Sequence, residues 1–391
     1  MSKSSDPPTP ERRPTSVPLH ERFAPWGWLR SRMREWVFRE FHKLTLTDDG
    51  KTILANSLRG LLHNAPPPLG HELASTAPPY AGLGQARLDN RTDQRTDIVF
   101  ITGRFRSGST LLWNLFRQIP GCTSYYEPFN ERRWFDPAHR GTHTDQTHRH
   151  AEAYWLEYDG MTVLGDYYRE EWIDRNLYMD ERFWDPLMKR YIEILIERAP
   201  GRPVLQFNRV DFRLPWFRWY FPHATILHLY RHPRDQWCST LRNLEAFPKE
   251  KGFAEYAPHD HFYLRNWTRD LRYHFPFLEE QHLTHPYELF YLIWRLSYLF
   301  GRKFAHTSLA YEELVQNPEE RIAALLNLID LRDYDLNRLT ALIVRPEGAR
   351  WRRYAEESWF QERESHCENL LAEYFGILTD RTTNESHSNL R

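Results

Sequence analysis

The stretch DIVFITGRFRSGST, residues 97–110, decides the fold. Its first part, DIVFIT, is apolar on both faces, as in a strand that is buried within a parallel sheet. A glycine-rich turn follows from Gly103 to Thr110, and LLWNLF continues the chain as a helix. This order directs backbone N–H groups and the positive end of a helix dipole at one point, where an anion can bind. We therefore predict that the turn binds a phosphate or a group like it.

The same order of strand and helix returns along the chain. PVLQFN (203–208) and ATILHLY (224–230) are predicted as buried strands, and the second leads through RHPRD into a helical stretch. TSLAYEEL (307–314) is predicted as a strand followed by a helix. Strands that alternate with helices are typical of an α/β fold, in which helices flank a parallel β-sheet. This is the fold class that we predict.

Composition indicates how the chain is organised. Residues 1–20 are rich in Pro, Ser, Thr and charge, so they bury too little apolar surface to fold and are predicted as a disordered tail. We expect a helical extension and a Pro/Gly-rich connector over 21–95, the main domain over 96–376 and a flexible tail over 377–391. Within the main domain, residues 134–200 lose the strand and helix pattern and are predicted as an insertion over the sheet.

Charge limits the kinds of partner. The chain has 52 Lys and Arg against 53 Asp and Glu, so its net charge of −1 provides no overall field to attract nucleic acid. In residues 26–41, however, apolar residues recur at helical spacing between arginines. This segment is predicted as a basic amphipathic helix, which either docks on the main domain or makes peripheral contact with an anionic membrane surface. The oligomeric state is left open.

Cysteine and histidine usage predicts neither disulfide bonds nor a metal site. The three cysteines, Cys122, Cys238 and Cys367, have no paired spacing. Four histidines stand at irregular spacing in a polar stretch that is predicted as a solvated loop, His139, His143, His148 and His150. The N-terminus lacks the apolar core of a signal peptide, and the longest apolar stretch is too short to span a bilayer. We therefore expect a cytoplasmic protein.

The glycine-rich turn has the spacing of a nucleotide P-loop, G-x-x-x-x-G-K-S/T, with one departure. Ser109 occupies the place of the lysine, so positive charge comes from Arg106 within the turn and from Arg104. In addition, the strand ATILHLY runs into Arg231 and not into the Asp that kinases and NTPases need for magnesium. The turn is therefore suited to a phosphate-like group without the metal apparatus of ATP chemistry.

A second anion feature begins at the end of that strand, in RHPRDQWCS (231–239). An arginine at the strand tip and a serine two helical turns later can clamp one phosphate from two sides. Arg231 and Ser239 are therefore predicted as a phosphate site.

Together the two motifs resemble those of the sulfotransferase superfamily, and their order and separation match as well. RSGST (106–110) is similar to the loop that holds the 5′-phosphosulfate, and RHPRDQWCS is similar to the 3′-phosphate site. AYEELVQNPEERIAALLNLIDL (310–331) and GARWRRYAEE (348–357) resemble later elements of the family. The resemblance covers residues 97–375.

This resemblance implies a P-loop NTPase-like sulfotransferase fold, in which 3′-phosphoadenosine 5′-phosphosulfate (PAPS) is the co-substrate and no metal takes part. It implies that Arg231 and Ser239 bind the 3′-phosphate. The 5′-phosphosulfate is then bound by the loop residues, with Arg104 as an additional cation: Arg106, Ser107, Gly108, Ser109 and Thr110.

The base that takes the acceptor proton is also inferred from the resemblance. Cytosolic aryl sulfotransferases carry a lysine at the position of Arg106 and a histidine base on a later strand, and this chain has neither. It is closer to the carbohydrate and tyrosylprotein branches, where a glutamate takes the proton, and Glu127 in SYYEPFN matches that glutamate. Glu127 and Arg106 are thus the predicted catalytic residues. The usual histidine region holds Asn208, Arg209 and Asp211, whose roles are left open.

The predicted function is sulfuryl transfer from PAPS to a hydroxyl-type acceptor, with residues 134–200 on the acceptor side. A carbohydrate, a lipid headgroup, a phenol and a peptide are equally compatible with the sequence. Two alternatives remain: a P-loop kinase or NTPase, and an inactive relative that only binds the nucleotide. A kinase is stabilised by ATP with magnesium, whereas 3′,5′-adenosine bisphosphate (PAP) stabilises a sulfotransferase or its inactive relative.

Overall fold

The computed structural model describes residues 95–142, 151, 153–345 and 349–375, together with positions 33, 36, 40 and 47. By its contacts the chain divides into two units, Met1–Leu88 and Asp89–Arg391, and the description below concerns the second. The predicted tails, most of the predicted helix 26–41 and three of the four loop histidines lie outside the described residues. No helix in the described ranges is long and apolar enough to cross a membrane.

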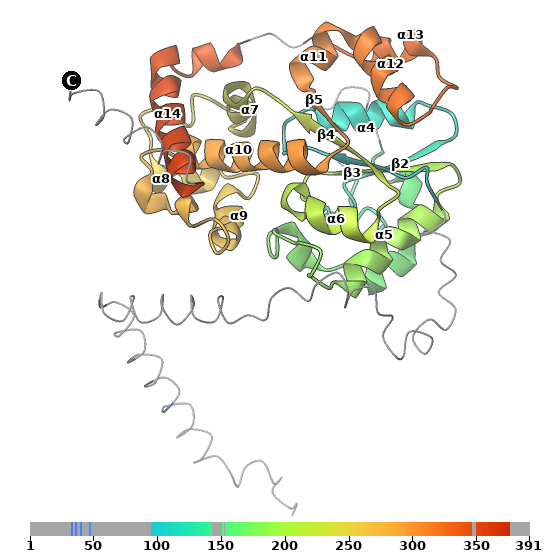
Figure 1. The fold of residues 1–391 in the computed structure, drawn as a ribbon, viewed down its shortest axis with the longest axis horizontal. Coiled ribbons are helices and arrows are strands. Elements are labelled where there is room, and N and C mark those ends of the chain that lie inside the picture. The colour runs from blue at the N-terminus through green and yellow to red at the C-terminus, as the bar shows by residue number, and fades with distance from the viewer. Residues whose placement is uncertain are drawn as a thin grey trace, which may run out of the picture. The chain divides into compact units, whose positions relative to one another are not determined.

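A parallel sheet of five strands forms the centre of the described domain, in the order β2-β3-β1-β4-β5 (Figure 1). In register, Val99 of the central strand lies opposite Val204 on one side and Thr225 on the other. The predicted α/β fold is therefore confirmed. The strands are β1 (Val99–Thr102), β2 (Cys122–Tyr126), β3 (Arg202–Phe207), β4 (Thr225–Tyr230) and β5 (Thr307–Ala310).

Helices cover both faces of the sheet, and in Figure 1 α4 and α11 to α13 lie above it, with α5 and α6 below. The α-helices are α4 (Ser109–Arg117), α5 (Pro186–Arg198), α6 (Leu214–Tyr220), α7 (Pro233–Thr240), α8 (Phe253–Tyr256), α9 (Leu264–Leu271), α10 (Pro286–Phe304), α11 (Tyr311–Gln316), α12 (Pro318–Leu328), α13 (Leu336–Ala341) and α14 (Glu357–Tyr374). The short 3-10 helices are η2 (Leu156–Tyr158), η3 (Thr162–Asp166), η4 (Glu170–Ile173), η5 (Asp211–Arg213), η6 (Ala257–His259), η7 (Pro276–Leu278), η8 (Glu280–His282) and η9 (Arg350–Arg353).

The central strand supplies both layers of the core, because successive side chains of a strand point to opposite faces. Val99 and Ile101 pack into the cluster with α4 and α12, whereas Phe100 packs into the cluster with α5 and α6. All three side chains are buried. Burial on both faces explains why this strand is apolar without alternation.

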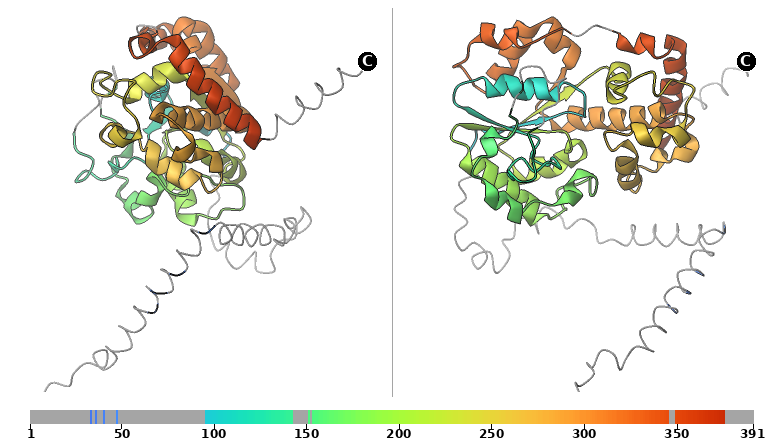
Figure 2. Two further views of the ribbon diagram at one scale, coloured as in Figure 1. Left: turned by 90° about the vertical axis from the view of Figure 1, so that its left-hand side faces the viewer. Right: turned by 180° about the vertical axis from the view of Figure 1, so that it is seen from behind.

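A third apolar cluster lies beside the sheet and is rich in aromatic residues. The long helix α10 contacts α6 and β4 and also α7, α9 and α14, so it joins the sheet to this group of helices (Figure 2). The fully buried rings of Trp237, Trp267 and Tyr287 form the centre of the cluster. This group of helices holds α7, which carries Ser239.

The segment predicted as an insertion contains no strand in its described residues, 134–142, 151 and 153–200. Its middle part forms η2, η3 and η4, which place aromatic side chains such as Tyr158 and Trp172 in the core with α5 and α6. Its last part contains α5, which precedes β3. Asp185 is the residue before this helix, and its carboxylate caps the helix by accepting a hydrogen bond from the Met188 N–H (2.8 Å).

Candidate active site

The carboxyl ends of all five strands meet at one edge of the sheet, and the predicted site residues lie there. The connection from β1 leads to β2 on one side of the sheet, and the connection from β3 crosses β1 to β4 on the other side, so this edge holds the switch point at which α/β sheets bind ligands. In sheet order, the residues that follow the strands are Glu127, Asn208, Gly103, Arg231 and Tyr311. Three of these belong to the motifs singled out in the sequence.

The turn between β1 and α4 has a backbone that only particular residues adopt easily. Gly108 caps α4 in the left-handed region at φ 96°, and Arg106 also has a positive φ of 67°. A Cβ atom on Gly108 would lie 2.4 Å from the ring of Tyr311. Glycine is therefore required at 108 both by the backbone and by the neighbouring ring.

Two polar groups beside the turn fit an anion. The Ser107 hydroxyl is buried and has no hydrogen-bond partner in the described part of the chain. The same is true of Nε of Arg231. Buried donors of this kind are costly unless a ligand or water pairs with them, so the site suits a phosphate or sulfate group.

The structure brings the two predicted anion motifs together. Arg106 Nε donates to Ser239 Oγ at 3.0 Å, and Arg231 Nη1 donates to the carbonyl oxygen of Arg106 at 3.3 Å. The Arg231 guanidinium lies 5.0 Å from the centre of the Tyr311 ring. Residues more than a hundred positions apart thus form one cationic site at the mouth of the turn.

Arg104 lies apart from this contact. Its guanidinium packs 4.4 Å from the centre of the Trp267 ring, in the aromatic cluster beside the sheet. Burial lowers the pKa of Arg104 to about 10, although the negative charge of Asp211 opposes the shift. A direct role of Arg104 at the anion site stays a prediction.

Glu127 directly follows β2 and points into a buried polar network. Glu127 is 5% exposed, and its backbone has a positive φ of 39°. Oε1 accepts a hydrogen bond from Asn208 Nδ2, and Oε2 accepts from Asn130 Nδ2 (2.6 Å) and Arg209 Nη1 (2.7 Å). These donors fix the orientation of the carboxylate.

Arg209 is shared between two carboxylates. Its Nη1 and Nη2 donate to Glu127 and Glu131, respectively. Burial lowers the pKa of Arg209, but the two carboxylates outweigh burial, so its pKa is raised overall. Arg209 therefore stays charged and balances Glu127.

Asp211 links two elements of the fold through its carboxylate. Its carboxylate accepts hydrogen bonds from Thr102 Oγ1 (2.6 Å) and Ser297 Oγ (2.9 Å), and so ties β1 to α10. Burial raises the pKa of Asp211, and the charge of Arg104 opposes this shift. Each oxygen of the carboxylate therefore accepts one hydrogen bond, Oδ1 from β1 and Oδ2 from α10.

Asn208 is the residue whose role the sequence did not indicate. It accepts a hydrogen bond from Ser109 at the start of α4 and donates one to Glu127. On the same side of the loop, the Thr110 and Tyr126 hydroxyls share a hydrogen bond of 3.2 Å. The turn after β1 is thus connected to the end of β2 through side chains at two points.

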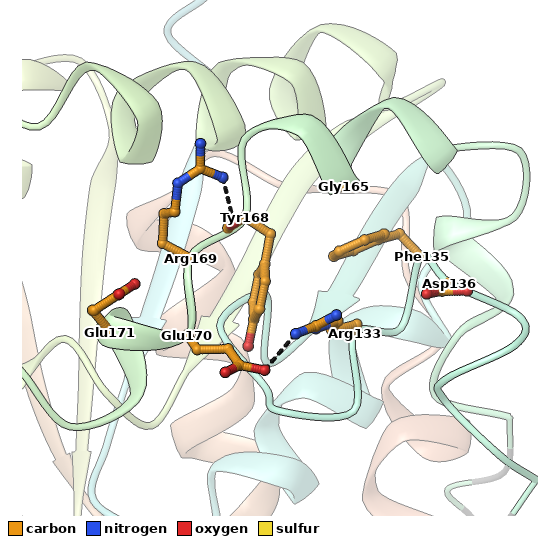
Figure 3. Close-up of a pocket in the computed structure, with 8 residues that line it drawn as sticks. All are labelled: Arg133, Phe135, Asp136, Gly165, Tyr168, Arg169, Glu170 and Glu171. Carbon is orange, nitrogen blue, oxygen red and sulfur yellow. Dashed lines mark hydrogen bonds and ion pairs between the residues drawn. The ribbon is translucent and has the colours of Figure 1, made fainter. Parts of the chain in front are cut away.

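A cavity of about 260 Å³ opens on the segment that follows β2 (Figure 3). Tyr168 in its wall donates to the carbonyl oxygen of Asn130 at 3.1 Å, and Asn130 in turn binds Glu127. An ion pair between Arg133 and Glu170 crosses the same wall. The lining residues are Arg133, Phe135, Asp136, Gly165, Tyr168, Arg169, Glu170 and Glu171.

The late basic segment lies against α7 on the other side of the site. The backbone N–H of Trp351 in η9 donates to Asp235 at 3.3 Å, and the Arg234 guanidinium lies 4.9 Å from the centre of the Trp351 ring. Arg234 also forms a two-point ion pair with Glu364 of α14. The described residues contain no cluster of His, Cys, Asp and Glu that could hold a metal ion.

Comparison with known proteins gives a family. A family model described as "Sulfotransferase family" matches residues 97–335, more than half of the chain. No curated protein matches the sequence. The matched residues include the turn after β1, Glu127, Arg231 and Ser239.

Several solved structures resemble the chain at low sequence identity. Sulfotransferase STF9 from Mycobacterium avium is 13% identical with a TM-score of 0.39, and the match covers 73% of this chain and 78% of that one. Mouse sulfotransferase SULT7A1, complexed with PAP, is 11% identical with a TM-score of 0.34 and coverages of 75% and 87%. The sulfotransferase domain from the curacin biosynthetic pathway is 14% identical with a TM-score of 0.35 and coverages of 71% and 97%.

Proposed function

The chain belongs to the sulfotransferase family, and we propose that it transfers the sulfuryl group of PAPS to a hydroxyl group of an acceptor. The observation that carries the proposal is the contact between Arg106 and Ser239, which joins the two anion motifs into one site. PAPS carries its 5′-phosphosulfate and its 3′-phosphate on the same ribose, so the two anionic groups lie close together. A site with two linked groups of anion-binding residues fits that molecule.

In this proposal the turn after β1 binds the phosphosulfate. Backbone N–H groups at the start of α4 and the unpaired Ser107 hydroxyl donate to its oxygens, and Arg106 faces the oxygen that becomes negatively charged. Arg231, Ser239 and the neighbouring η9 hold the 3′-phosphate. Transfer then breaks the bond between sulfur and the phosphate oxygen and forms a bond between sulfur and the acceptor oxygen.

Glu127 is the proposed base. The acceptor hydroxyl loses its proton as sulfur is transferred, and PAP leaves with the electrons of the broken bond. Oε1 of Glu127 accepts a hydrogen bond from Asn208, and we assign the acceptor proton to this oxygen. An arginine in the loop and a glutamate base support a place near the carbohydrate and tyrosylprotein branches of the family.

The acceptor reaches Glu127 from the side of residues 134–200 in this proposal. The cavity in Figure 3 is lined partly by that segment and is connected to Glu127 through Tyr168 and Asn130. Its lining combines two aromatic rings with charged side chains of both signs. A polar acceptor with a ring or a chain of hydroxyl groups fits such a surface.

Calorimetry tests the donor part of the proposal. We expect PAP to bind more tightly than adenosine 5′-monophosphate, and the gain should disappear in Arg231→Ala and Ser239→Ala, because only PAP carries a 3′-phosphate. Transfer is then measured as release of PAP from PAPS with 4-nitrophenol, a methyl glucoside and a tyrosine peptide as acceptors. Tighter binding of ATP with magnesium than of PAP would contradict the proposal and favour a kinase.

A further inference from the structure

The Asn208 side chain uses both ends of its amide, and the residue is only 5% exposed. Its Oδ1 accepts hydrogen bonds from Ser109 Oγ (2.8 Å) and from Gln206 Nε2 (2.7 Å). Its Nδ2 donates to Oε1 of Glu127. Because the carboxylate of Glu127 is paired with Arg209 and accepts from Asn208, a flipped amide would place two oxygen atoms against each other, so Glu127 fixes the orientation.

The place of Asn208 in the sheet explains what it connects. It follows β3, which lies between β2 and β1. Glu127 follows β2, and Ser109 follows the turn after β1. The amide therefore spans from the strand that carries the base to the strand that leads into the donor loop.

We propose that Asn208 is a positioning residue, which holds the carboxylate of Glu127 beside the donor loop in the orientation that accepts the acceptor proton. The inference rests on the proposed function. Arg209 and Asn130 bind the other oxygen of Glu127, so without Asn208 the carboxylate is free to rotate toward them. Rotation would turn Oε1 away from the acceptor.

The Ser109 hydroxyl explains why Gln206 is part of the network. A serine hydroxyl carries a single proton, and that proton is donated to Asn208. If Ser109 turns to donate to a bound phosphosulfate, it leaves Asn208. Gln206 then still holds Oδ1, so the amide keeps its N–H directed at Glu127 while the donor is bound.

Asn208→Asp tests the proposal through the pH dependence of the transfer rate. The change keeps the shape but sets a carboxylate against Glu127, whose other charged or titratable neighbours are Arg209, Tyr126 and Tyr158. Two carboxyl groups in contact share a proton, so the acidic limb of the kcat profile should move up by about one pH unit or more. The affinity for PAP should stay within about twofold of wild type, as in other losses confined to the chemical step.

Asn114→Asp is the matched control, because it also converts a buried amide into a carboxylate but lies in α4, whereas the amides that donate to Glu127 are those of Asn130 and Asn208. Its profile should keep the wild-type midpoint. Gln206→Met provides a second variant, which removes the hydrogen bond from Gln206 to Asn208 and leaves in place the hydrogen bonds given above for Glu127. It should lower kcat roughly tenfold with unchanged PAP affinity, an effect expected for one lost orienting hydrogen bond, and the loss should vanish when Asn208 is already Ala.

The outcomes separate this inference from the proposed function. A wild-type protein that neither binds PAP nor releases it from PAPS overturns both. Wild-type transfer with an Asn208→Asp profile that equals that of Asn114→Asp overturns the positioning role alone. An additive effect of Gln206→Met and Asn208→Ala on kcat would overturn it as well, because residues in one network are not independent.

Discussion

Arg106 is the loop cation that stands in contact with the second anion motif, through its hydrogen bond to Ser239. We predict that Arg106→Ala lowers the transfer rate by a factor that corresponds to about 3 kcal/mol or more, because the lost charge faces the oxygen that becomes negative in the transition state. Arg117→Ala serves as the control, since Arg117 lies in the last turn of α4, the helix that follows the loop, and pairs with Glu157. Near-wild-type turnover of Arg106→Ala would refute the role of the loop.

Glu127→Gln tests the base. Glutamine keeps the size of the side chain but cannot take a proton, so kcat should fall by roughly 10²- to 10⁴-fold while PAP still binds. Glu131→Gln is the matched comparison, because Glu131 pairs with the same Arg209 but its side chain is 47% exposed. Its effect on kcat should be much smaller. Equal rates for the two variants would move the search for the base elsewhere.

The sequence indicates the residues of the loop and of the second motif, because each stands at a fixed spacing within a recognisable pattern. Asn208 could not be found in this way. An asparagine at the end of an apolar strand carries no signal of its own, and its role arises from Ser109, Gln206 and Glu127. Ser109 and Glu127 follow other strands of the sheet, so they become neighbours of Asn208 only when the sheet has formed.

At the scale of elements, β1, β3, β4 and β5 coincide with predicted strands, whereas β2 was not predicted. The four predicted strands contain apolar runs, and three of them are buried between neighbours on both sides. β2 lies at the edge of the sheet and has the sequence CTSYY, in which hydroxyl groups replace most aliphatic side chains. An edge strand needs less apolar surface, so hydrophobicity alone misses it.

The junction of β1 and α4 gives a prediction about its glycine. Gly108→Ala should destabilise the protein by more than the roughly 1 kcal/mol cost of a left-handed alanine, because its Cβ would also meet the Tyr311 ring. Gly160 provides the control, since it too has a positive φ but open space around its Cβ position. Urea unfolding of the two alanine variants measures the difference, and equal free energies of unfolding would refute the steric part.

At the scale of the whole molecule, two buried histidines make stability depend on pH. Burial lowers the pKa of both His228 and His285 from 6.5 to about 3. Both sit against α10: His285 caps its first turn, and the ring of His228 lies where a Cβ on Gly301 would be. Below pH 6.5 the unfolded chain binds protons that the folded chain refuses, so stability falls as the pH drops toward 3.

His285→Asn tests this dependence. Asparagine is a good helix cap but does not titrate, so the slope of the unfolding free energy between about pH 4 and 6, which lies inside this window, should fall by about 1.4 kcal/mol per pH unit relative to wild type. Urea unfolding at several pH values measures the slope. His306→Asn is a useful comparison, because His306 is exposed and its pKa is lowered less strongly. An unchanged slope in His285→Asn would show that His285 is protonated in the folded protein.

The strand order of the sheet also governs how the protein is made. Val99 pairs with Val204 and Thr225, which are synthesised long after it, and the anion site needs Tyr311 as well. Such high contact order makes folding slow, because long loops must close before the pairing can be gained. Until β3 and β4 have left the ribosome, the edges of the apolar strand β1 lack their final partners and are exposed to aggregation. A nascent chain that ends before β4 should therefore depend on chaperones and bind no nucleotide.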